Sequence, residues 1–421
     1  MGAVPKRPLG IDVLTAARQR IAYILRRCPR VYLSGPSGKD SGVMMHLVCQ
    51  EAREMGRRVG VLYIDLEAQY RATVDFVGKM FRLYGDVIEP HWLCLPVALR
   101  NAVSQFQPKW CAWDPDARGA WVREPPPGAI VDPGRFPWYR PPEPGRAGET
   151  AMEFEEIVPA FGAWYAQGEL TACFVGIRTG ESLNRWRAIA GDHSRFTDPD
   201  TGERHCWTTY KGGTVYNAYP LYDWTTADVW RFYGKTGLPY PKTYDLMHRA
   251  GLSIHEQRIC QPYGDDQRRG LWLFSVLEPE TWARVVSRVS GANMGALYAQ
   301  ERGSVQGRHH VTKPAGMTWE QYAKVLLASL PPKSRQQFEN NFSTFLAFYA
   351  KRGMTTIPDE ADPALEAARK APSWRRLVKC LLKNDYWAKT LSFNMRKSDT
   401  AAWRKYQKLM ERRRQKWGPQ W

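Results

Sequence analysis

The sequence predicts an α/β protein, with a mostly parallel sheet followed by a basic helical region. Up to about residue 270, continuous apolar runs that end in Gly or charged residues alternate with segments of helical periodicity. From about residue 271 the strand patterns stop, and helical segments separated by Gly, Pro and charge clusters follow. We therefore expect two domains, 1–270 and 271–421.

The elements at the start of the chain are expected in a regular order. Apolar positions at helical spacing predict a helix over 11–27, before a first strand at 30–34. A second helix is expected from about Ser41 to Met55. The continuous apolar run at 59–65 predicts a buried parallel strand.

A Gly-rich turn joins the first strand to the second helix, between Ser34 and Ser41. Such a turn points backbone N–H groups at one place, at the positive end of a helix dipole, where phosphate binds. A Walker A loop ends in Gly-Lys-Ser/Thr, whereas here Asp40 follows Lys39, so that motif is excluded. An ordinary Gly-rich βα turn is the alternative.

Two carboxylates follow the second strand in Asp65-Leu66-Glu67. Open α/β sheets bind ligands at the carboxyl ends of their strands, so these residues are placed to reach a nucleotide ribose or Mg²⁺. The alternative is that Asp65 caps a helix over 68–84.

After a third strand at 92–97 the regular alternation breaks down. Eight prolines between Arg123 and Arg146 preclude regular structure there. Several Trp and Tyr residues in the same region argue against a flexible linker. We expect 98–148 to be an ordered, irregular excursion over the ligand edge of the sheet.

The regular pattern returns with a helix over 149–167 and a buried strand at 170–177. This strand leads into Arg178, Glu181, Arg185 and Arg187, which indicates either an anion site or the start of an exposed, charged helix. Further on, a short extended segment precedes a helix capped by Thr225 or Thr226. The later helices are expected at 280–303, 318–330, 334–352, 362–383 and 398–416.

The chain carries 60 Lys and Arg against 42 Asp and Glu, a net charge of +18, which favours a polyanionic partner. The 18 Trp and 20 Tyr residues suit stacking on bases as well as core packing. Nucleic acid is therefore an expected partner, and a solvated basic surface is the alternative.

The chain has eight cysteines and no Cys-x-x-Cys pair, which indicates reduced cytosolic thiols and no iron–sulfur cluster. Cys94, Cys111, His205 and Cys206 would meet around a metal only through tertiary folding. No apolar run reaches the roughly 20 residues of a membrane span, and no signal peptide is visible. A cytoplasmic location is expected.

Four motifs in the same order resemble the phosphoadenosine phosphosulfate (PAPS) reductase-like branch of the PP-loop superfamily. The segment Ser34–Ser41 resembles the PP-loop of N-type ATP pyrophosphatases, Ser-Gly-Gly-x-Asp-Ser, with Pro36-Ser37 as an insertion or with Ser37 in place of the first Gly. The other three motifs are Asp65-Leu66-Glu67, then Gly176-Ile177-Arg178 with Glu181-Ser182 and Arg185, then Pro220–Thr225 with Asp228-Val229-Trp230.

Further segments resemble the immunoglobulin-binding regulator A group of reductase-like proteins. They are Leu95-Pro96, Arg100-Asn101-Ala102, Trp121-Val122-Arg123-Glu124 and residues 255–264. This resemblance implies a ParB/sulfiredoxin-like protein as a partner.

The resemblance implies an enzyme that binds ATP, or a related adenine nucleotide, together with Mg²⁺. It would cleave the α–β phosphate bond and adenylate an acceptor, for which the charge favours a nucleic-acid base. Backbone N–H groups and hydroxyls would hold the leaving pyrophosphate, and they belong to Ser34, Gly35, Ser37, Gly38 and Ser41.

Charged residues complete the implied site. Lys39 would neutralise charge as it develops, and Asp40 with Asp65 would orient the loop or bind the metal. Arg178 and Arg185 would hold a second anionic group. The remaining members of the expected nucleotide-binding set are Glu67, Glu181 and Asp223.

Two other functions stay open at this point. One is PAPS or adenylyl-sulfate reduction, with Cys260 replacing the tail cysteine of true reductases, because their Glu-Cys-Gly-Leu-His motif is absent here. The other is a non-catalytic nucleotide sensor that binds DNA as a regulatory subunit. Pro36-Ser37 either reshapes a working pyrophosphate cradle or marks one that no longer turns over.

Overall fold

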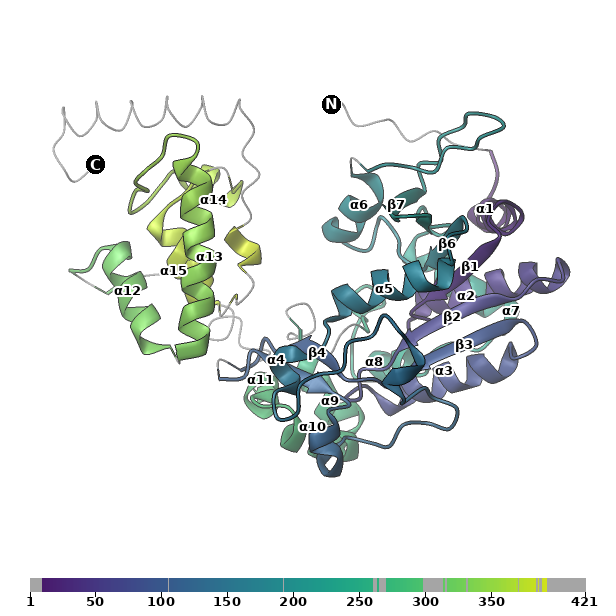
Figure 1. Cartoon of the computed structure of the whole chain (residues 1–421), viewed down its shortest axis with the longest axis horizontal. Helices are drawn as coiled ribbons and strands as arrows, with labels where there is room; N and C mark the ends of the chain where they lie inside the picture. Colours follow the sequence, from purple (N-terminus) through teal and green to yellow (C-terminus); the bar gives the residue numbers. More distant parts are fainter. Residues whose placement is uncertain are drawn as a thin grey trace. The chain divides into compact units, whose positions relative to one another are not determined.

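The chain folds into two compact units in a computed structural model (Figure 1). The first unit extends to Arg100 and again from Lys109 to Val289, and the second comprises Asn101–Pro108 and the chain from Ser290 onward. The structure describes residues 10–104, 106–191, 193–259, 263–264, 270–297, 313–314, 316–330, 332–369, 371–383, 385 and 388–391.

A six-stranded sheet organises the first unit, in the order β3-β2-β1-β6-β8-β7. All neighbouring strands pair in parallel except β7, which runs antiparallel to β8 at one edge. This topology confirms the predicted α/β class. The strands are β1 (Arg30–Ser34), β2 (Val59–Ile64), β3 (Ile88–Leu93), β6 (Thr171–Val175), β7 (Thr208–Gly212) and β8 (Val215–Ala218).

Two parts of the predicted strand pattern differ from the structure. The third strand was expected at 92–97, but β3 pairs from Ile88 because its register follows β2. The excursion was expected to be irregular throughout, yet it contains a hairpin of β4 (Val97–Arg100) and β5 (Lys109–Ala112). Its other regular pieces are η1 (Pro115–Ala120), η2 (Pro133–Arg135) and α4 (Ala147–Thr150).

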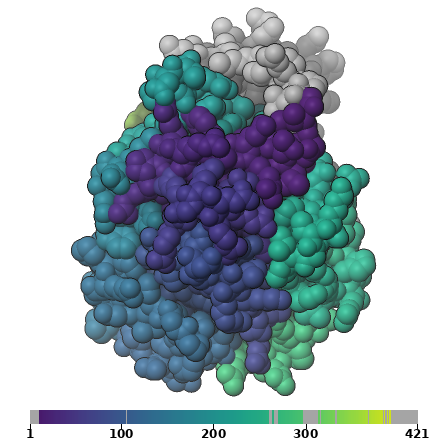
Figure 2. Space-filling model, turned by 90° about the vertical axis from the view of Figure 1, so that its right-hand side faces the viewer, coloured from purple at the N-terminus to yellow at the C-terminus, as the bar shows by residue number. Residues whose placement is uncertain are grey.

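Helices cover both faces of the sheet. Successive side chains of β1 point to opposite faces of the sheet. Val31 and Leu33 belong to a core shared with α1, α2, α3 and α7 on one face, whereas Tyr32 packs on α5 on the other. Figure 2 shows the purple and blue segments from the early part of the chain together on one face, with green segments from later in the chain beside them. The helices are α1 (Val13–Arg27), α2 (Lys39–Glu54), α3 (Arg71–Leu83), α5 (Phe154–Ala166), α7 (Thr226–Thr236), α8 (Thr243–Arg249), α9 (Leu271–Leu277) and α10 (Pro279–Arg288).

His46, inside this core on α2, is held as a neutral imidazole. Its Nε2 lies 2.8 Å from the carbonyl oxygen of Pro239 and its Nδ1 lies 2.6 Å from the hydroxyl of Tyr84. Because a carbonyl only accepts hydrogen bonds, Nε2 carries the proton and Nδ1 accepts from Tyr84. Burial lowers the pKa of His46 to about 4.

This pKa predicts a loss of stability in mild acid. The folded pKa lies below the unfolded value of about 6.5, so the contribution of His46 is present above that value and is lost as the pH falls toward 4. Between pH 7 and 5 the free energy of unfolding should fall by about 2 kcal/mol more in the parent protein than in His46→Gln. Urea unfolding at both pH values measures this, and equal pH dependence in the two proteins would contradict it.

After Ser290 the regular elements that the structure describes are all helical, as predicted. The helix expected at 362–383 is instead two helices, because Ser373 caps a new helix after the chain leaves the first one at Ala368. A core of aromatic and aliphatic side chains, among them Phe338, Phe345, Tyr349 and Leu377, holds α12, α13 and α15 together. The expected helix at 398–416 lies outside the described residues. The helices are α11 (Ala292–Leu297), α12 (Trp319–Ser329), α13 (Pro332–Ala350), α14 (Pro363–Ala367), α15 (Trp374–Leu382) and the short η4 (Lys389–Leu391).

None of the helices that the structure describes has the length and apolar character needed to cross a membrane.

Candidate functional site

The strand order reverses between β1 and β6, and this point defines the candidate site. From β1 the chain proceeds to β2 and β3 on one side, and it later returns through β6 and β8 on the other. The loops after β1 and β6 both lie at the carboxyl edge of the sheet, and in open α/β sheets ligands bind where the strand order reverses at this edge. These loops are residues 35–38 and 176–182.

The second loop packs closely on the start of α2, directly after the first loop. A Cβ atom on Gly176 would lie 2.5 Å from the Cα atom of Ser41 and 2.9 Å from its backbone nitrogen. Only glycine permits this approach, because backbone atoms cannot move aside as a flexible side chain can. Gly35 adopts a φ of +69° and donates its N–H to the carbonyl of Leu62 in β2 (3.0 Å). The predicted phosphate loop and the loop at Gly176 are thus brought together.

The phosphate loop ends in a capped helix. Gly38 is the N-cap of α2, and its N–H donates to the hydroxyl of Ser41 at 3.0 Å. The next N–H, that of Lys39, donates to the hydroxyl of Tyr244 on α8 at 3.2 Å. An anion bound at this helix end would take the place of the Tyr244 hydroxyl.

The side chain of Lys39 folds back into the protein. Its ammonium lies 3.5 Å from the carbonyl oxygen of Gln257, 3.2 Å from a carboxylate oxygen of Asp40 and 5.0 Å from the ring centroid of Tyr244. Lys39 is therefore available for phosphate only after it leaves these partners.

Asp40 and Arg178 form a buried ion pair between the two loops. The Nε of Arg178 donates to Asp40, and its other nitrogens reach the carbonyl of Trp224 (3.3 Å) and the hydroxyl of Thr226 (3.4 Å). The Arg178 side chain is only 3% exposed. Through these contacts Arg178 holds the start of α2 against the start of α7. The sequence did not predict this positioning role of Arg178.

Asp65, at the end of β2, is fully buried among donors of the protein itself. Arg123 from the excursion donates to one carboxylate oxygen, as does the N–H of Glu67 (2.9 Å). The indole N–H of Trp92 donates to the other oxygen at 2.8 Å.

Glu67 is equally buried and receives four hydrogen bonds. The N–H groups of Trp113 and Val122 donate to it at 2.7 and 3.0 Å, and Arg288 on α10 adds a bidentate pair at 2.9 and 3.1 Å. Asp65 and Glu67 thus fasten the excursion and α10 to the sheet edge. No local sequence signal points to this function, because their arginine partners lie far along the chain.

The metal ligands that the sequence predicts do not fit a Mg²⁺ site in this arrangement. Asp40 and Asp65 are each neutralised by an arginine, Arg178 and Arg123 respectively. Across the part of the chain that the structure describes, no three His, Cys, Asp or Glu side chains are grouped to hold a metal, and this covers Cys94, Cys111, His205 and Cys206. Burial raises the pKa of the Cys94 and Cys111 thiols, which disfavours the thiolate that binds metals.

The remaining predicted residues lie at different places. Arg185 is about half exposed and lies 4.0 Å from the carboxylate of Glu181. Asp223 instead accepts a bidentate pair from Arg20 on α1, at 2.9 and 2.7 Å. Ser34 ends β1, and Ser37 donates its N–H to the carbonyl of Gly35 at 2.9 Å. Cys260 lies outside the described residues.

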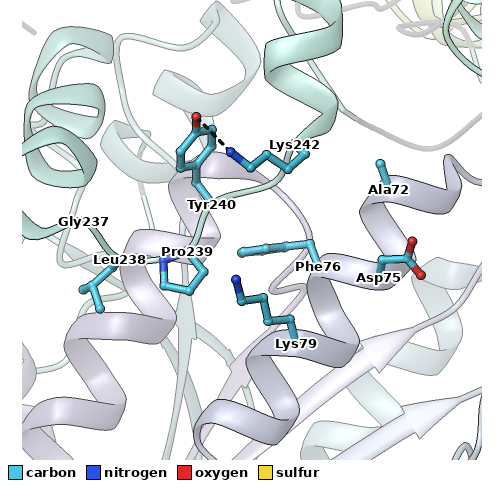
Figure 3. Close-up of a pocket in the computed structure, with 9 residues that line it drawn as sticks. All are labelled: Ala72, Asp75, Phe76, Lys79, Gly237, Leu238, Pro239, Tyr240 and Lys242. Atoms are coloured by element: carbon cyan, nitrogen blue, oxygen red, sulfur yellow. Dashed lines mark hydrogen bonds between the residues drawn. The ribbon is translucent and has the colours of Figure 1, made fainter.

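A separate groove of about 380 Å³ lies between α3 and the segment that follows α7 (Figure 3). The amines of Lys79 and Lys242 flank the ring of Phe76, and Lys242 also reaches the hydroxyl of Tyr240 at 3.5 Å. None of the predicted site residues lines this groove. Its lining residues are Ala72, Asp75, Phe76, Lys79, Gly237, Leu238, Pro239, Tyr240 and Lys242.

Solved structures similar to this chain are nucleotide enzymes at low sequence identity. The phosphoadenylyl-sulfate (PAPS) reductase of Candida auris aligns over 62% of this chain and 99% of its own, with 13% identity and a TM-score of 0.32. Yeast FAD synthetase aligns over 57% and 65%, with 15% identity and a TM-score of 0.30. The FMN adenylyltransferase of Candida glabrata, in complex with ATP, aligns over 57% and 62%, with 13% identity and a TM-score of 0.30. At these TM-scores the fold assignment rests on the strand order of the chain itself.

Sequence comparison gives a much stronger match. Residues 251–360 match the model of a domain of unknown function, DUF3440. The uncharacterized protein YbdN of Escherichia coli K12 is 40% identical over 419 residues, which cover 99% of this chain and 98% of the relative. The chain therefore belongs to the same family as YbdN.

Proposed function

We propose that the protein is an adenine-nucleotide enzyme of the PP-loop type, which cleaves ATP between the α and β phosphates and adenylates an acceptor. The observation that supports this most directly is the close approach of Gly176 to the backbone of Ser41. This approach joins a Gly-rich loop at a helix N-terminus to a second loop at the point where the strand order reverses. Phosphate groups of nucleotides bind at such places.

The residues at the start of α2 would act on the leaving group. Helix N–H groups and the Ser41 hydroxyl would bind the pyrophosphate, and the Lys39 ammonium would move from Gln257 and Tyr244 to the charge that develops on it. The acceptor forms a bond to the α-phosphorus, the bond to the bridging oxygen breaks, pyrophosphate leaves, and the acceptor loses a proton. Arg178 would keep Asp40 in place and so hold the loop in shape.

Gly176→Ala should weaken ATP binding by at least tenfold, because its Cβ would push the second loop away from Ser41. Gly180→Ala is the matched control, since a Cβ there meets no atom within 4 Å. Calorimetric titration of both variants with ATP measures the difference. Equal affinities would show that contact between the loops is not needed for the nucleotide.

The reaction itself is tested with labelled ATP, Mg²⁺ and single-stranded or duplex nucleic acid as acceptor. AMP, pyrophosphate and a mass increase of the acceptor are the expected products. ATP binding without any release of pyrophosphate would overturn the enzymatic proposal and favour a nucleotide sensor.

A further inference from the structure

Helix α6 (Leu183–Ala190) presents large apolar side chains to water. Residues 183–187 are all exposed, and only Ile189 is buried. Leu183 is 60% exposed and Trp186 is 48% exposed, although both are residue types that usually pack inside. Figure 1 shows α6 at the periphery of the first unit. Packing within the described fold therefore does not account for this pair.

Three arginines lie on or near the helix that carries Trp186. Arg185 and Arg187 are its neighbours in sequence on α6, and both are exposed. A third, Arg258, donates to the carbonyl oxygen of Glu181 at 2.5 Å, which places it beside the start of α6. The Glu181 carboxylate is 4.0 Å from Arg185, so it neutralises that guanidinium only weakly. Exposed arginine side chains thus lie on and beside the helix that presents the indole.

The position of this surface ties it to the candidate site. Ser182 caps α6 by accepting the N–H of Arg185 at 3.2 Å. Only residues 177–182 separate α6 from Gly176, where an added Cβ atom would lie 2.5 Å from the Cα atom of Ser41. A molecule held on α6 would therefore be bound a few residues along the chain from the loop that packs against the start of α2.

We propose that α6, through Trp186, Leu183, Arg185 and Arg187 together with Arg258, binds single-stranded nucleic acid as the acceptor. This proposal rests on the proposed function. An exposed indole can stack only on bases that are not already paired and stacked, and the leucine on the same helix adds apolar contact with such bases. Guanidinium groups beside them suit the phosphates between those bases. The net charge of +18 favours such a polyanion over a neutral partner.

The test measures binding of the full chain to fluorescently labelled single-stranded and duplex oligonucleotides of one sequence, by anisotropy at several salt concentrations. Trp186→Ala should weaken binding of the single strand about tenfold, and Trp186→Phe should keep most of it. Arg187→Ala should lower the slope of log K against log salt by about 0.7. Phe106→Ala, which removes another highly exposed aromatic side chain, should change nothing.

Three results would overturn the proposal. They are unchanged binding in Trp186→Ala, equal affinity for the duplex, and displacement of the strand by polyglutamate at equal charge, which would indicate an acidic protein as the partner. ATP titration of the same variants separates this proposal from the proposed function. Failure of the parent protein to bind ATP would overturn the proposed function, while strand binding that depends on Trp186 would still support this surface.

Discussion

Asp40→Ala is expected to lower the free energy of unfolding by about 3–5 kcal/mol. The substitution leaves two buried cations without their carboxylate, because Arg178 is 3% exposed and the Lys39 side chain is 7% exposed. Desolvation of a charge in the interior is costly unless an opposite charge compensates it. Urea unfolding followed by circular dichroism measures the change.

The control for this experiment is an aspartate–arginine pair on the surface. Asp86 binds Arg53 through two hydrogen bonds of 2.8 Å, but about half of each side chain is exposed. Asp86→Ala should therefore cost less than about 1 kcal/mol. The double variant Asp40→Ala/Arg178→Met should recover part of the loss, because it removes one uncompensated charge. An equal decrease in the free energy of unfolding for Asp40→Ala and Asp86→Ala would contradict the expected effect of burying the Asp40–Arg178 pair.

Glu67→Ala is expected to cost a similar amount, about 3–5 kcal/mol, and to loosen the excursion. The change leaves Arg288 and the N–H groups of Trp113 and Val122 without their acceptor. Each buried donor that loses its acceptor carries a desolvation cost of about 1–3 kcal/mol. Limited proteolysis should then cut the Pro-rich segment between η1 and α4 much faster than in the parent protein.

A glutamate within the same excursion provides the comparison. Glu143 binds Arg146 at 2.7 Å with both side chains exposed, so Glu143→Ala should change neither stability nor cleavage by more than a small amount. The loss of stability and the cleavage rate of Glu67→Gln should lie between those of Glu143→Ala and Glu67→Ala. The amide oxygen of glutamine still accepts hydrogen bonds, but the negative charge that faces Arg288 is lost. Slow cleavage in Glu67→Ala would show that other contacts hold the excursion.

The position of the two candidate loops at the sheet edge was predictable from local features, but the partners of the carboxylates there were not. Ser34–Ser41 and Gly176 could be assigned to strand ends from apolar runs and glycines, and the structure brings them together. A carboxylate after a strand looks the same in sequence whether it faces a ligand or an arginine elsewhere in the chain. Asp65 and Glu67 proved to face Arg123 and Arg288.

The sequence by itself determined the alternation of β1, β2 and β6 with helices, the Gly-rich turn before α2, a threonine cap at the start of α7 and the helical character of the second unit. These features depend on periodicity and on neighbouring residues, which a linear reading contains. Tertiary structure alone decided the register of β3, the edge strand β7, the buried pair of Asp40 with Arg178 and the exposure of Trp186. These four features depend on which segments, far apart in the sequence, pack against one another. Burial and charge pairing are properties of the packed chain and not of neighbouring residues.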